Sequence, residues 1–258
     1  LETYRSHNVR SSEEVFNKGR AIIQAKGSMG SESWEFLEQL AFAALDIGQT
    51  SFAEQCIQQL DSKFPGSPRV DRLKGLRLEA LGNYDDALTL YESLIESDPT
   101  NVPIWKRKIS ALRSVGRIQL ATEELIKYLD AFYGDHEGWL ELADIYASNA
   151  QYDPSLASLS HVLLLVPQNP FYVLQAGETA YTARDVPLAL KFFLRVVEMA
   201  PTGGPSTRGW YGVKMCTRKL LSHPAFPSPS STPPPPPKTL SLLDELATER
   251  VLASYSTS

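Results

Sequence analysis

The residue types most often used for catalysis or metal binding are few in this sequence and are not grouped. The histidines are scattered along the chain, at His7, His136, His161 and His223. His136-Glu137 begins the H-E-x-x-H pattern of a zinc protease, but the second histidine is missing. Cys56 and Cys216 form no C-x-x-C pair and have no histidine nearby, so we interpret them as buried thiols in a reducing compartment.

Other catalytic patterns are also missing. The sequence contains no phosphate-binding glycine loop, no G-x-S-x-G and no EF-hand spacing. The carboxylate pair Asp85-Asp86 falls at the start of a predicted helix, where the helix dipole favours negative charge for structural reasons. We therefore predict that the chain is not an enzyme and has no catalytic site, no metal site and no cofactor.

The amino-acid composition limits the classes of partner that the chain is expected to bind. The formal net charge of −5 argues against nucleic-acid binding, which needs clustered Lys and Arg to neutralise phosphates. The longest apolar run, 162–166, is far shorter than the roughly 20 residues of a membrane-spanning helix. No signal peptide and no N-x-[ST] acceptor is visible, so we expect a protein partner outside the secretory lumen.

The strongest pattern in the sequence is a 34-residue repeat. Prolines follow it at positions 65, 99, 167 and 201, and Trp105 and Trp139 share the same spacing. Small residues follow it too, at Gly48, Gly82 and Gly116, and at Ala53, Ala87, Ala121 and Ala189. Each unit is long enough for two helices and two turns, with glycine ending the first helix and proline ending the second.

This register divides the chain into predicted segments. A capping helix occupies 1–33, and five repeats follow at 34–67, 68–101, 102–135, 136–169 and 170–203. A second capping helix is expected at 204–221, a Pro-rich linker at 222–238 and a terminal helix at 239–258. One repeat cannot bury its apolar face alone, so stacking on neighbours must supply the stability.

The order of residue types within the repeats is the tetratricopeptide signature. Repeat 136–169 shows it as Trp139, Leu142, Ala143, Tyr146, Leu159 and Pro167. Five such units in register predict an all-α fold, and the resemblance implies a right-handed α-solenoid of about five tetratricopeptide repeats with capping helices at both ends. We expect the signature residues themselves to be core.

The C-terminal region changes composition abruptly. Residues 222–238 are rich in Pro and Ser, which predicts an extended, semi-rigid linker that can span roughly 50 Å at about 3.1 Å per residue. Within it, Pro224 to Pro227 fits P-x-x-P, although a spacer is favoured over a ligand motif, and Ser228-Pro229 is a candidate for phosphorylation. The terminal helix has leucines at helical spacing, so it either packs back on the solenoid or binds a partner.

Binding chemistry is expected on the first helix of each repeat, because these helices line the concave surface of such a solenoid. The side chains predicted to meet a partner there are Arg69, Arg72, Lys106, Arg113, Asp144, Phe171, Glu178 and Tyr181. This set predicts a groove that is basic near its middle and acidic toward its C-terminal end. Solvation of these charges without any ligand is the alternative.

One tetratricopeptide class grips acidic chaperone tails with a Lys and an Asn at fixed positions of its first repeat. This sequence has Glu38 and Phe42 at those positions, and no other repeat offers the pair. The sequence therefore disfavours chaperone-tail binding.

A more specific resemblance lies between Trp105 and Pro201. Residues outside the repeat consensus carry it, in the segments 106–108, 137–144, 159–165, 167–169 and 190–197. These segments resemble the family of subunit 2 of the endoplasmic reticulum membrane protein complex. The resemblance covers about residues 11–221, while the Pro-rich linker looks like a lineage-specific insertion.

The resemblance implies a cytosolic scaffold at the endoplasmic reticulum membrane, peripheral to the bilayer and in contact with it only through partners. It implies a hetero-oligomer that includes subunits 3, 5 and 8 or 9, and a complex that inserts tail-anchored and other transmembrane segments. The alternative is a free tetratricopeptide adaptor that binds a short peptide motif in its concave groove. The two differ in whether membrane subunits copurify with the chain in equal amounts.

Overall fold

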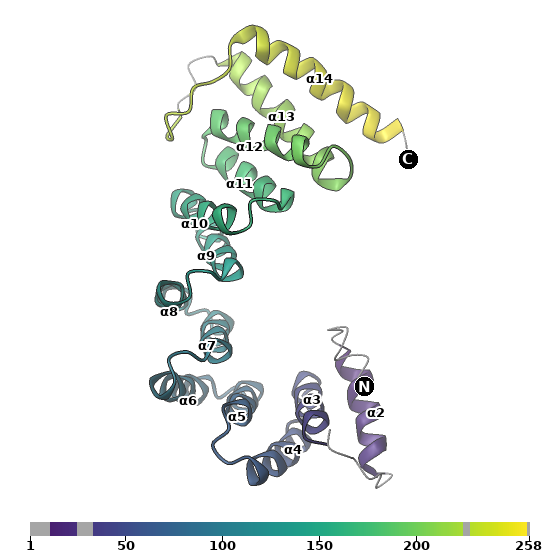
Figure 1. Cartoon of the computed structure of the whole chain (residues 1–258), viewed down its shortest axis with the longest axis vertical. Helices are drawn as coiled ribbons and strands as arrows, with labels where there is room; N and C mark the ends of the chain where they lie inside the picture. Colours follow the sequence, from purple (N-terminus) through teal and green to yellow (C-terminus); the bar gives the residue numbers. More distant parts are fainter. Residues whose placement is uncertain (1–10, 25–32, 224–227, 257–258) are drawn as a thin grey trace. The chain divides into compact units, whose positions relative to one another are not determined.

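The computed structural model describes residues 11–24, 33–223 and 228–256, and in these ranges the regular structure is helical throughout (Figure 1). The helices are α2 Ser12–Gln24, α3 Ser33–Asp46, α4 Thr50–Lys63, α5 Pro68–Ala80, α6 Tyr84–Ser97, α7 Val102–Ser114, α8 Ile118–Ala131, α9 His136–Ser148, α10 Tyr152–Leu165, α11 Pro170–Thr182, α12 Val186–Met199, α13 Gly204–Ser222 and α14 Pro237–Ser256. Pro224 to Pro227, which contain the P-x-x-P match, and the predicted loop 27–30 lie outside the described residues.

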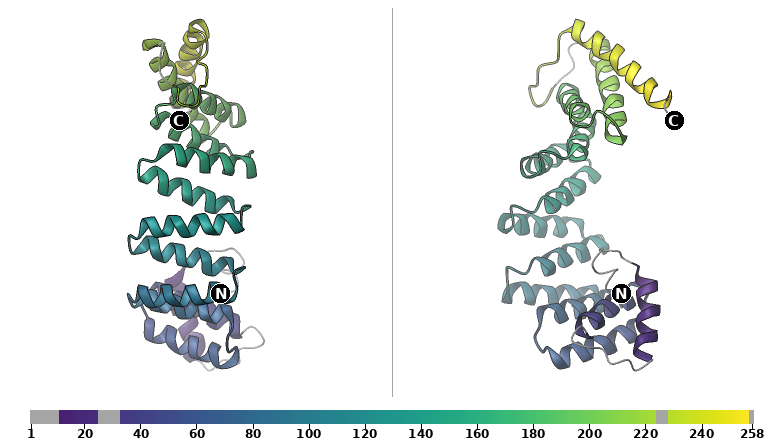
Figure 2. Two further views of the ribbon diagram at one scale, coloured as in Figure 1. Left: turned by 90° about the vertical axis from the view of Figure 1, so that its left-hand side faces the viewer. Right: turned by 45° about the vertical axis from the view of Figure 1, so that its right-hand side comes forward.

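The chain forms two compact units, residues 1–121 and 122–258, with the boundary inside α8. In each unit consecutive helices pack against one another, as α3 does against α4 in the first unit and α11 against α12 in the second. Figure 2 shows these neighbours lying side by side within each unit. The all-α tetratricopeptide solenoid predicted from the sequence is confirmed.

The helix boundaries follow the 34-residue spacing of the repeat. Second helices begin at Thr50, Tyr84, Ile118, Tyr152 and Val186, which keeps the 34-residue period through the array. Each of these helices starts two residues after a residue of positive φ, which ends the tight turn between the paired helices. Glycine fills that position at 48, 82 and 116, with φ values of 76°, 80° and 78°.

In the last two repeats the turn keeps its backbone shape although glycine is gone. Ala150 has φ 57° and Arg184 has φ 65°. A side chain in the left-handed region places Cβ too close to the following carbonyl oxygen, which costs roughly 1–2 kcal/mol. Neighbouring helices therefore hold these two residues in a conformation that their own side chains oppose.

We predict that Ala150→Gly and Arg184→Gly each stabilise the protein by about 0.5–1 kcal/mol, because glycine adopts positive φ without a steric penalty. Urea denaturation followed by circular dichroism measures this change. Gly82→Ala is the matched control and should destabilise by a similar amount, since nothing else lies within 4 Å of a Cβ placed there. Equal stability of all three variants and the parent chain would contradict this account of the turn.

The two helices of a repeat approach most closely where a small residue on the first meets a large one on the second. A Cβ on Gly75 would overlap the ring of Tyr91, and a Cβ on Gly177 would lie 3.1 Å from the ring of Phe193. Where the second helix carries the smaller Leu159, the first helix has room for Ala143. A larger side chain on one helix is thus matched by a smaller residue on the other, because a close-packed core tolerates neither a void nor an overlap.

Gly75→Ala should therefore destabilise the first unit by roughly 1–3 kcal/mol through overpacking against Tyr91. A second change, Tyr91→Leu, restores the volume found at Ala143 and Leu159 but removes the tyrosine hydroxyl. We expect the double variant to be more stable than the sum of the two single effects predicts. A double-mutant cycle in urea measures that coupling, and strict additivity would rule out a steric conflict.

The terminal helix α14 packs back on α13, which resolves the choice left open by its sequence. Leu240 and Ala247 of α14 are buried in the core that α11, α12 and α13 share. Asp244 anchors the pair, with its carboxylate 2.8 Å from Lys214 Nζ and 3.2 Å from Arg218 Nε. Although the Pro-rich linker was predicted to be extended, α14 therefore lies against α13 and is not held away from it.

The start of the helix after the linker differs from the expected one, while α13 begins at residue 204 as predicted. Helix α14 begins at Pro237 rather than after residue 238, because proline fits the first turn of a helix, where its missing N–H is not needed. Helix α13 begins at Gly204, with Pro205 in its first turn for the same reason.

Both thiols are buried, as predicted. Burial raises the pKa of Cys56 to about 11 and that of Cys216 to about 12. Among the described residues, none of the helices is both long and apolar enough to cross a membrane.

Candidate partner-binding site

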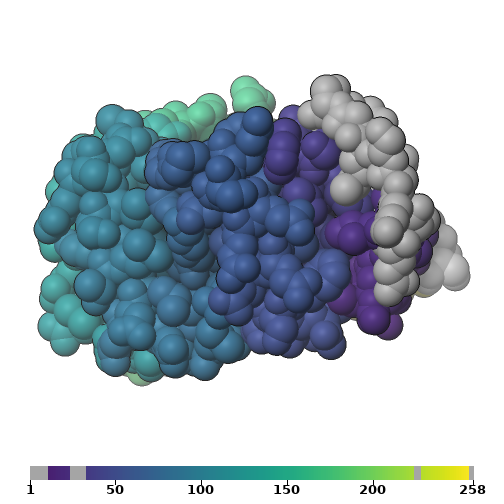
Figure 3. All heavy atoms as spheres, turned by 90° about the horizontal axis from the view of Figure 1, so that it is seen from below, coloured from purple at the N-terminus to yellow at the C-terminus, as the bar shows by residue number. Residues whose placement is uncertain are grey.

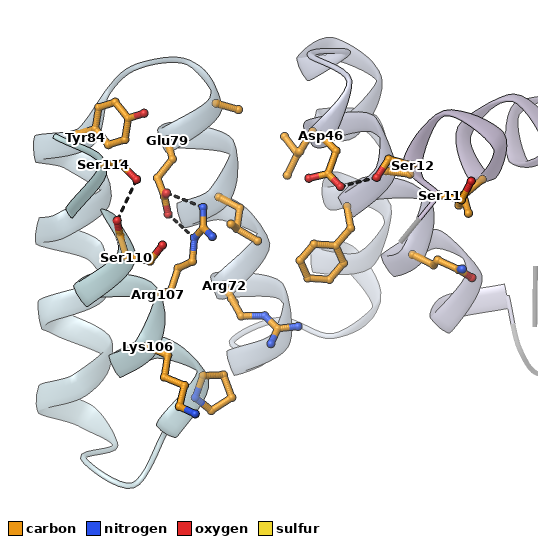
Figure 4. Close-up of a pocket in the computed structure, with 18 residues that line it drawn as sticks. Ser11, Ser12, Asp46, Arg72, Glu79, Tyr84, Lys106, Arg107, Ser110 and Ser114 are labelled. Atoms are coloured by element: carbon orange, nitrogen blue, oxygen red, sulfur yellow. Dashed lines mark hydrogen bonds and ion pairs between the residues drawn. The ribbon is translucent and has the colours of Figure 1, made fainter. Parts of the chain in front are cut away.

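A cavity of the first unit has a volume of about 700 Å³ and is lined mainly by the first helices of the repeats. Helices α3, α5 and α7 contribute one side chain after another to its wall, and the start of α2 adds Ser11 and Ser12 (Figure 4). Cationic groups of Arg72, Lys106 and Arg107 and the carboxylates of Asp46 and Glu79 share this space with apolar Phe42 and Leu76. The cavity therefore offers one excess positive charge and an apolar wall.

Helices α5 and α7 are tied together at the cavity by one buried carboxylate. Glu79 accepts hydrogen bonds of 2.7 and 2.6 Å from Nε and Nη2 of Arg107 and one of 2.6 Å from the Tyr91 hydroxyl. Burial and the hydrogen bond to Glu79 raise the pKa of Tyr91, so the hydroxyl stays a donor. Arg107 therefore has a structural role, and the carboxylate of Glu79 largely neutralises its positive charge.

Arg72 is a second cation of the cavity wall. Its guanidinium lies 5.1 Å from the centre of the Phe42 ring and 3.6 Å from Glu38, and Figure 4 shows it directed into the space between α3 and α5. Its Nε is buried without a hydrogen-bond partner in the described structure. Lys106, one helix further on, also lines the cavity. Glu38 and Phe42, which argue against a chaperone-tail clamp, thus orient Arg72 instead.

The opposite wall comes from the N-terminal helix, which the sequence assigned only to capping. The Ser12 hydroxyl donates to Asp46 over 2.5 Å, and Val15 and Phe16 of α2 are buried in the core with Leu37 and Leu40. In Figure 3 the purple atoms of α2 lie directly against the atoms of the helices that follow. The capping helix therefore closes the cavity as well as the core.

The other predicted site residues are divided between the two units. Arg69 is exposed and paired with Glu38, while Arg113 is exposed on α7 and does not line the cavity. In the second unit, Asp144 accepts a 2.8 Å hydrogen bond from Gln175, and Glu178 pairs with Arg208 at 2.7 Å. Lys219 lies over the Tyr181 ring, whereas Phe171 is 58% exposed.

These pairs share a pattern that the sequence did contain. Glu38 and Arg69 are 31 residues apart, Glu79 and Arg107 are 28 apart, and Glu178 and Arg208 are 30 apart. Each pair joins the first helix of one repeat to the next helix in the same layer. An acidic residue followed by a basic one at nearly the repeat spacing is therefore a signal for Arg107, which the groove positions missed.

Comparison with known proteins decides the family. The family model for the EMC2 TPR-like repeat domain matches residues 63–189. ER membrane protein complex subunit 2-B of Xenopus laevis is 37% identical over 228 residues, which cover 87% of this chain and 76% of that protein. The chain belongs to the family of ER membrane protein complex subunit 2.

Other relatives agree with this family and with the fold. The TPR repeat protein oca3 of Schizosaccharomyces pombe is 35% identical over 200 residues, covering 76% of this chain and 70% of that one. Among solved structures, the C-terminal part of a TPR repeat-containing protein from Cytophaga hutchinsonii superposes with a TM-score of 0.63 at 16% identity. That match covers 98% of this chain and 93% of the other and supports the fold of this subunit 2 family member.

We predict that Glu79→Gln destabilises the chain by about 2–3 kcal/mol, because Arg107 then faces a neutral amide and Tyr91 loses a charged acceptor. Chemical denaturation measures the loss. Glu96→Gln is the control, since the same change at an exposed position of α6 should stay within about 0.5 kcal/mol. Equal effects of the two substitutions would show that the Glu79 cluster adds no stability.

Proposed function

We propose that this chain is a non-catalytic scaffold subunit of the ER membrane protein complex. Its membership of the subunit 2 family carries the proposal. The repeat architecture suits the role, because stacked helices present long surfaces on which several partners can dock at once.

The proposal includes a place for one partner. The cavity of the first unit, with Arg72 and Lys106 beside Phe42 and Leu76, suits an extended protein segment that carries a carboxylate next to an apolar side chain. The rigid walls made by the Glu79 and Asp46 pairs lower the ordering cost of binding such a segment. We also propose that the other predicted groove residues contact partners within each unit separately, Arg69 and Arg113 in the first unit and Asp144, Phe171, Glu178 and Tyr181 in the second.

The second unit offers apolar rather than basic contacts. Leu164 is 74% exposed and Phe171 is 58% exposed. We assign these side chains to partner contact as well.

We further propose that the chain lies peripherally at the cytoplasmic face of the endoplasmic reticulum membrane and bridges the cytosolic parts of membrane subunits, including subunits 3 and 5, with subunit 8 or 9 on another face. In this position it supports insertion of tail-anchored and other transmembrane segments without performing chemistry itself.

Purification from the native cell tests the scaffold role. The tagged chain is solubilised from membranes in mild detergent, and we expect transmembrane subunits to copurify in equal amounts. If the chain instead elutes alone from the soluble fraction, the scaffold role is wrong, and a free adaptor that binds a short peptide in the same cavity becomes the better account.

Charge removal tests the cavity. Arg72→Gln combined with Lys106→Gln should lower the recovery of at least one copurifying subunit about tenfold, since both cations line the site. Arg117→Gln is the control, because this exposed residue lies just after α7, does not line the cavity and is not one of the predicted groove residues. Circular dichroism establishes that all variants are folded. Unchanged recovery with the double variant would remove the cavity from the interface.

A further inference from the structure

Asp185 is a buried carboxylate that joins two segments far apart in the sequence. It is 2% exposed and caps α12, accepting a 3.2 Å hydrogen bond at Oδ1 from the backbone N–H of Leu188. The same Oδ1 accepts 2.8 Å from the Ser228 hydroxyl, and Oδ2 accepts 2.8 Å from the N–H of Ser230. We call residues 228–232 the latch segment, because Asp185 holds them against the start of α12.

The carboxylate is ionised in this setting. Burial by itself raises the pKa of Asp185, but the hydrogen bonds from Ser230, Ser228 and Leu188 outweigh burial and lower it below its ordinary value. A buried anion without partners is costly, so the latch segment and Asp185 stabilise each other.

Ser228 has a second contact that closes the latch segment on itself. Its Oγ accepts a 3.0 Å hydrogen bond from the N–H of Thr232, while its carbonyl accepts 3.0 Å from the N–H of Ser231. The hydroxyl therefore donates to Asp185 and accepts from Thr232 at once. Any group attached to Oγ removes the donated bond, because the oxygen no longer carries a hydrogen.

The sequence around this hydroxyl is one that proline-directed kinases accept. Pro229 follows Ser228 directly, and Pro229, Ser230 and Ser231 are exposed while Ser228 is half-buried. We propose that Ser228 is a phosphorylation site and that its modification releases the latch segment from Asp185. This site is independent of the proposed scaffold function.

The reaction requires ATP and a proline-directed Ser/Thr kinase. Ser228 Oγ attacks the γ-phosphorus of ATP, the bond from that phosphorus to the β,γ-bridging oxygen breaks, and ADP leaves. The hydroxyl proton passes to the general base of the kinase. Since Oγ is engaged with Asp185 in the closed state, the kinase acts on the fraction of molecules in which the latch segment is open.

The product cannot return to the closed arrangement. A phosphoserine carries a charge of about −1.5 to −2 at neutral pH and would stand against the ionised carboxylate of Asp185. Its ester oxygen has no proton to donate. The N–H groups of Ser230 and Thr232, both hydrogen-bonded in the latch segment, then become open to solvent.

Helix α14 keeps its own anchor when the latch segment opens. Asp244 still pairs with Lys214 and accepts 3.1 Å from the Thr217 hydroxyl, and Leu240 and Ala247 stay in the core with α13. The expected change is therefore confined to the connection between α13 and α14 and to the first turn of α14.

The test uses the full chain, a proline-directed kinase with ATP and Mg²⁺, and mass spectrometry to locate the phosphate. We expect modification of Ser228, its loss in Ser228→Ala, and its retention in Thr232→Ala, which removes the neighbouring Thr232-Pro233 pair. Asp185→Asn keeps a good helix cap but loses an acceptor, so it should be modified about tenfold faster. If Ser228 stays unmodified in both the parent chain and Asp185→Asn, the site is wrong.

Hydrogen exchange measures the release of the latch segment from Asp185. In the phosphorylated chain the amides of Ser230 and Thr232 should exchange about tenfold faster or more than in the unmodified chain, while the middle of α14 is unchanged. Asp185→Asn should reproduce part of this increase without any phosphate. Phosphorylation of Ser228 with no change in exchange, for instance because Arg184 pairs with the phosphate and holds the segment in place, would overturn the release.

Discussion

Within each repeat, two helices must cross at a distance that leaves no void and no overlap. Tyr91 fits because Gly75 has no side chain, and Phe193 fits because Gly177 has none. Since a single pair of helices cannot bury its apolar face alone, this crossing has to be the same in successive repeats if they are to stack. The orientation of every first helix, and with it the wall of the cavity, follows from that packing.

Buried and partly buried carboxylates determine which helices of this apolar framework are neighbours. Glu79 joins α5, α6 and α7 through Arg107 and Tyr91, Asp244 joins α14 to α13, and Asp185 joins the latch segment to α12. Such groups contribute little net stability compared with apolar residues, yet removing one partner leaves an unpaired charge. They therefore specify which helix lies next to which, while apolar packing supplies most of the free energy.

The cavity that we propose as a binding surface is built from the first helices of successive repeats. Phe42 and Leu76 make its apolar wall, and its charges come from Asp46, Arg72, Glu79, Lys106 and Arg107. Arg107 is neutralised by Glu79, and Arg72 and Lys106 are the other cations that line the cavity and that we propose contact a partner.

The sequence by itself determined the all-helical repeat and its 34-residue register, because proline, glycine and aromatic residues recur at fixed spacing. It also indicated the family, through residues outside the repeat consensus between Trp105 and Pro201. It also placed Arg72 and Lys106 on the first helices. It did not reveal the positive φ of Ala150 and Arg184, since neither residue type favours that conformation and only packing of the flanking helices imposes it. Nor did it show that α2 walls the cavity or that α14 returns to α13. An amphipathic stripe predicts that one face of a helix is buried. It does not predict which surface buries that face, because this depends on contacts between residues far apart in the chain, and those exist only in the folded structure.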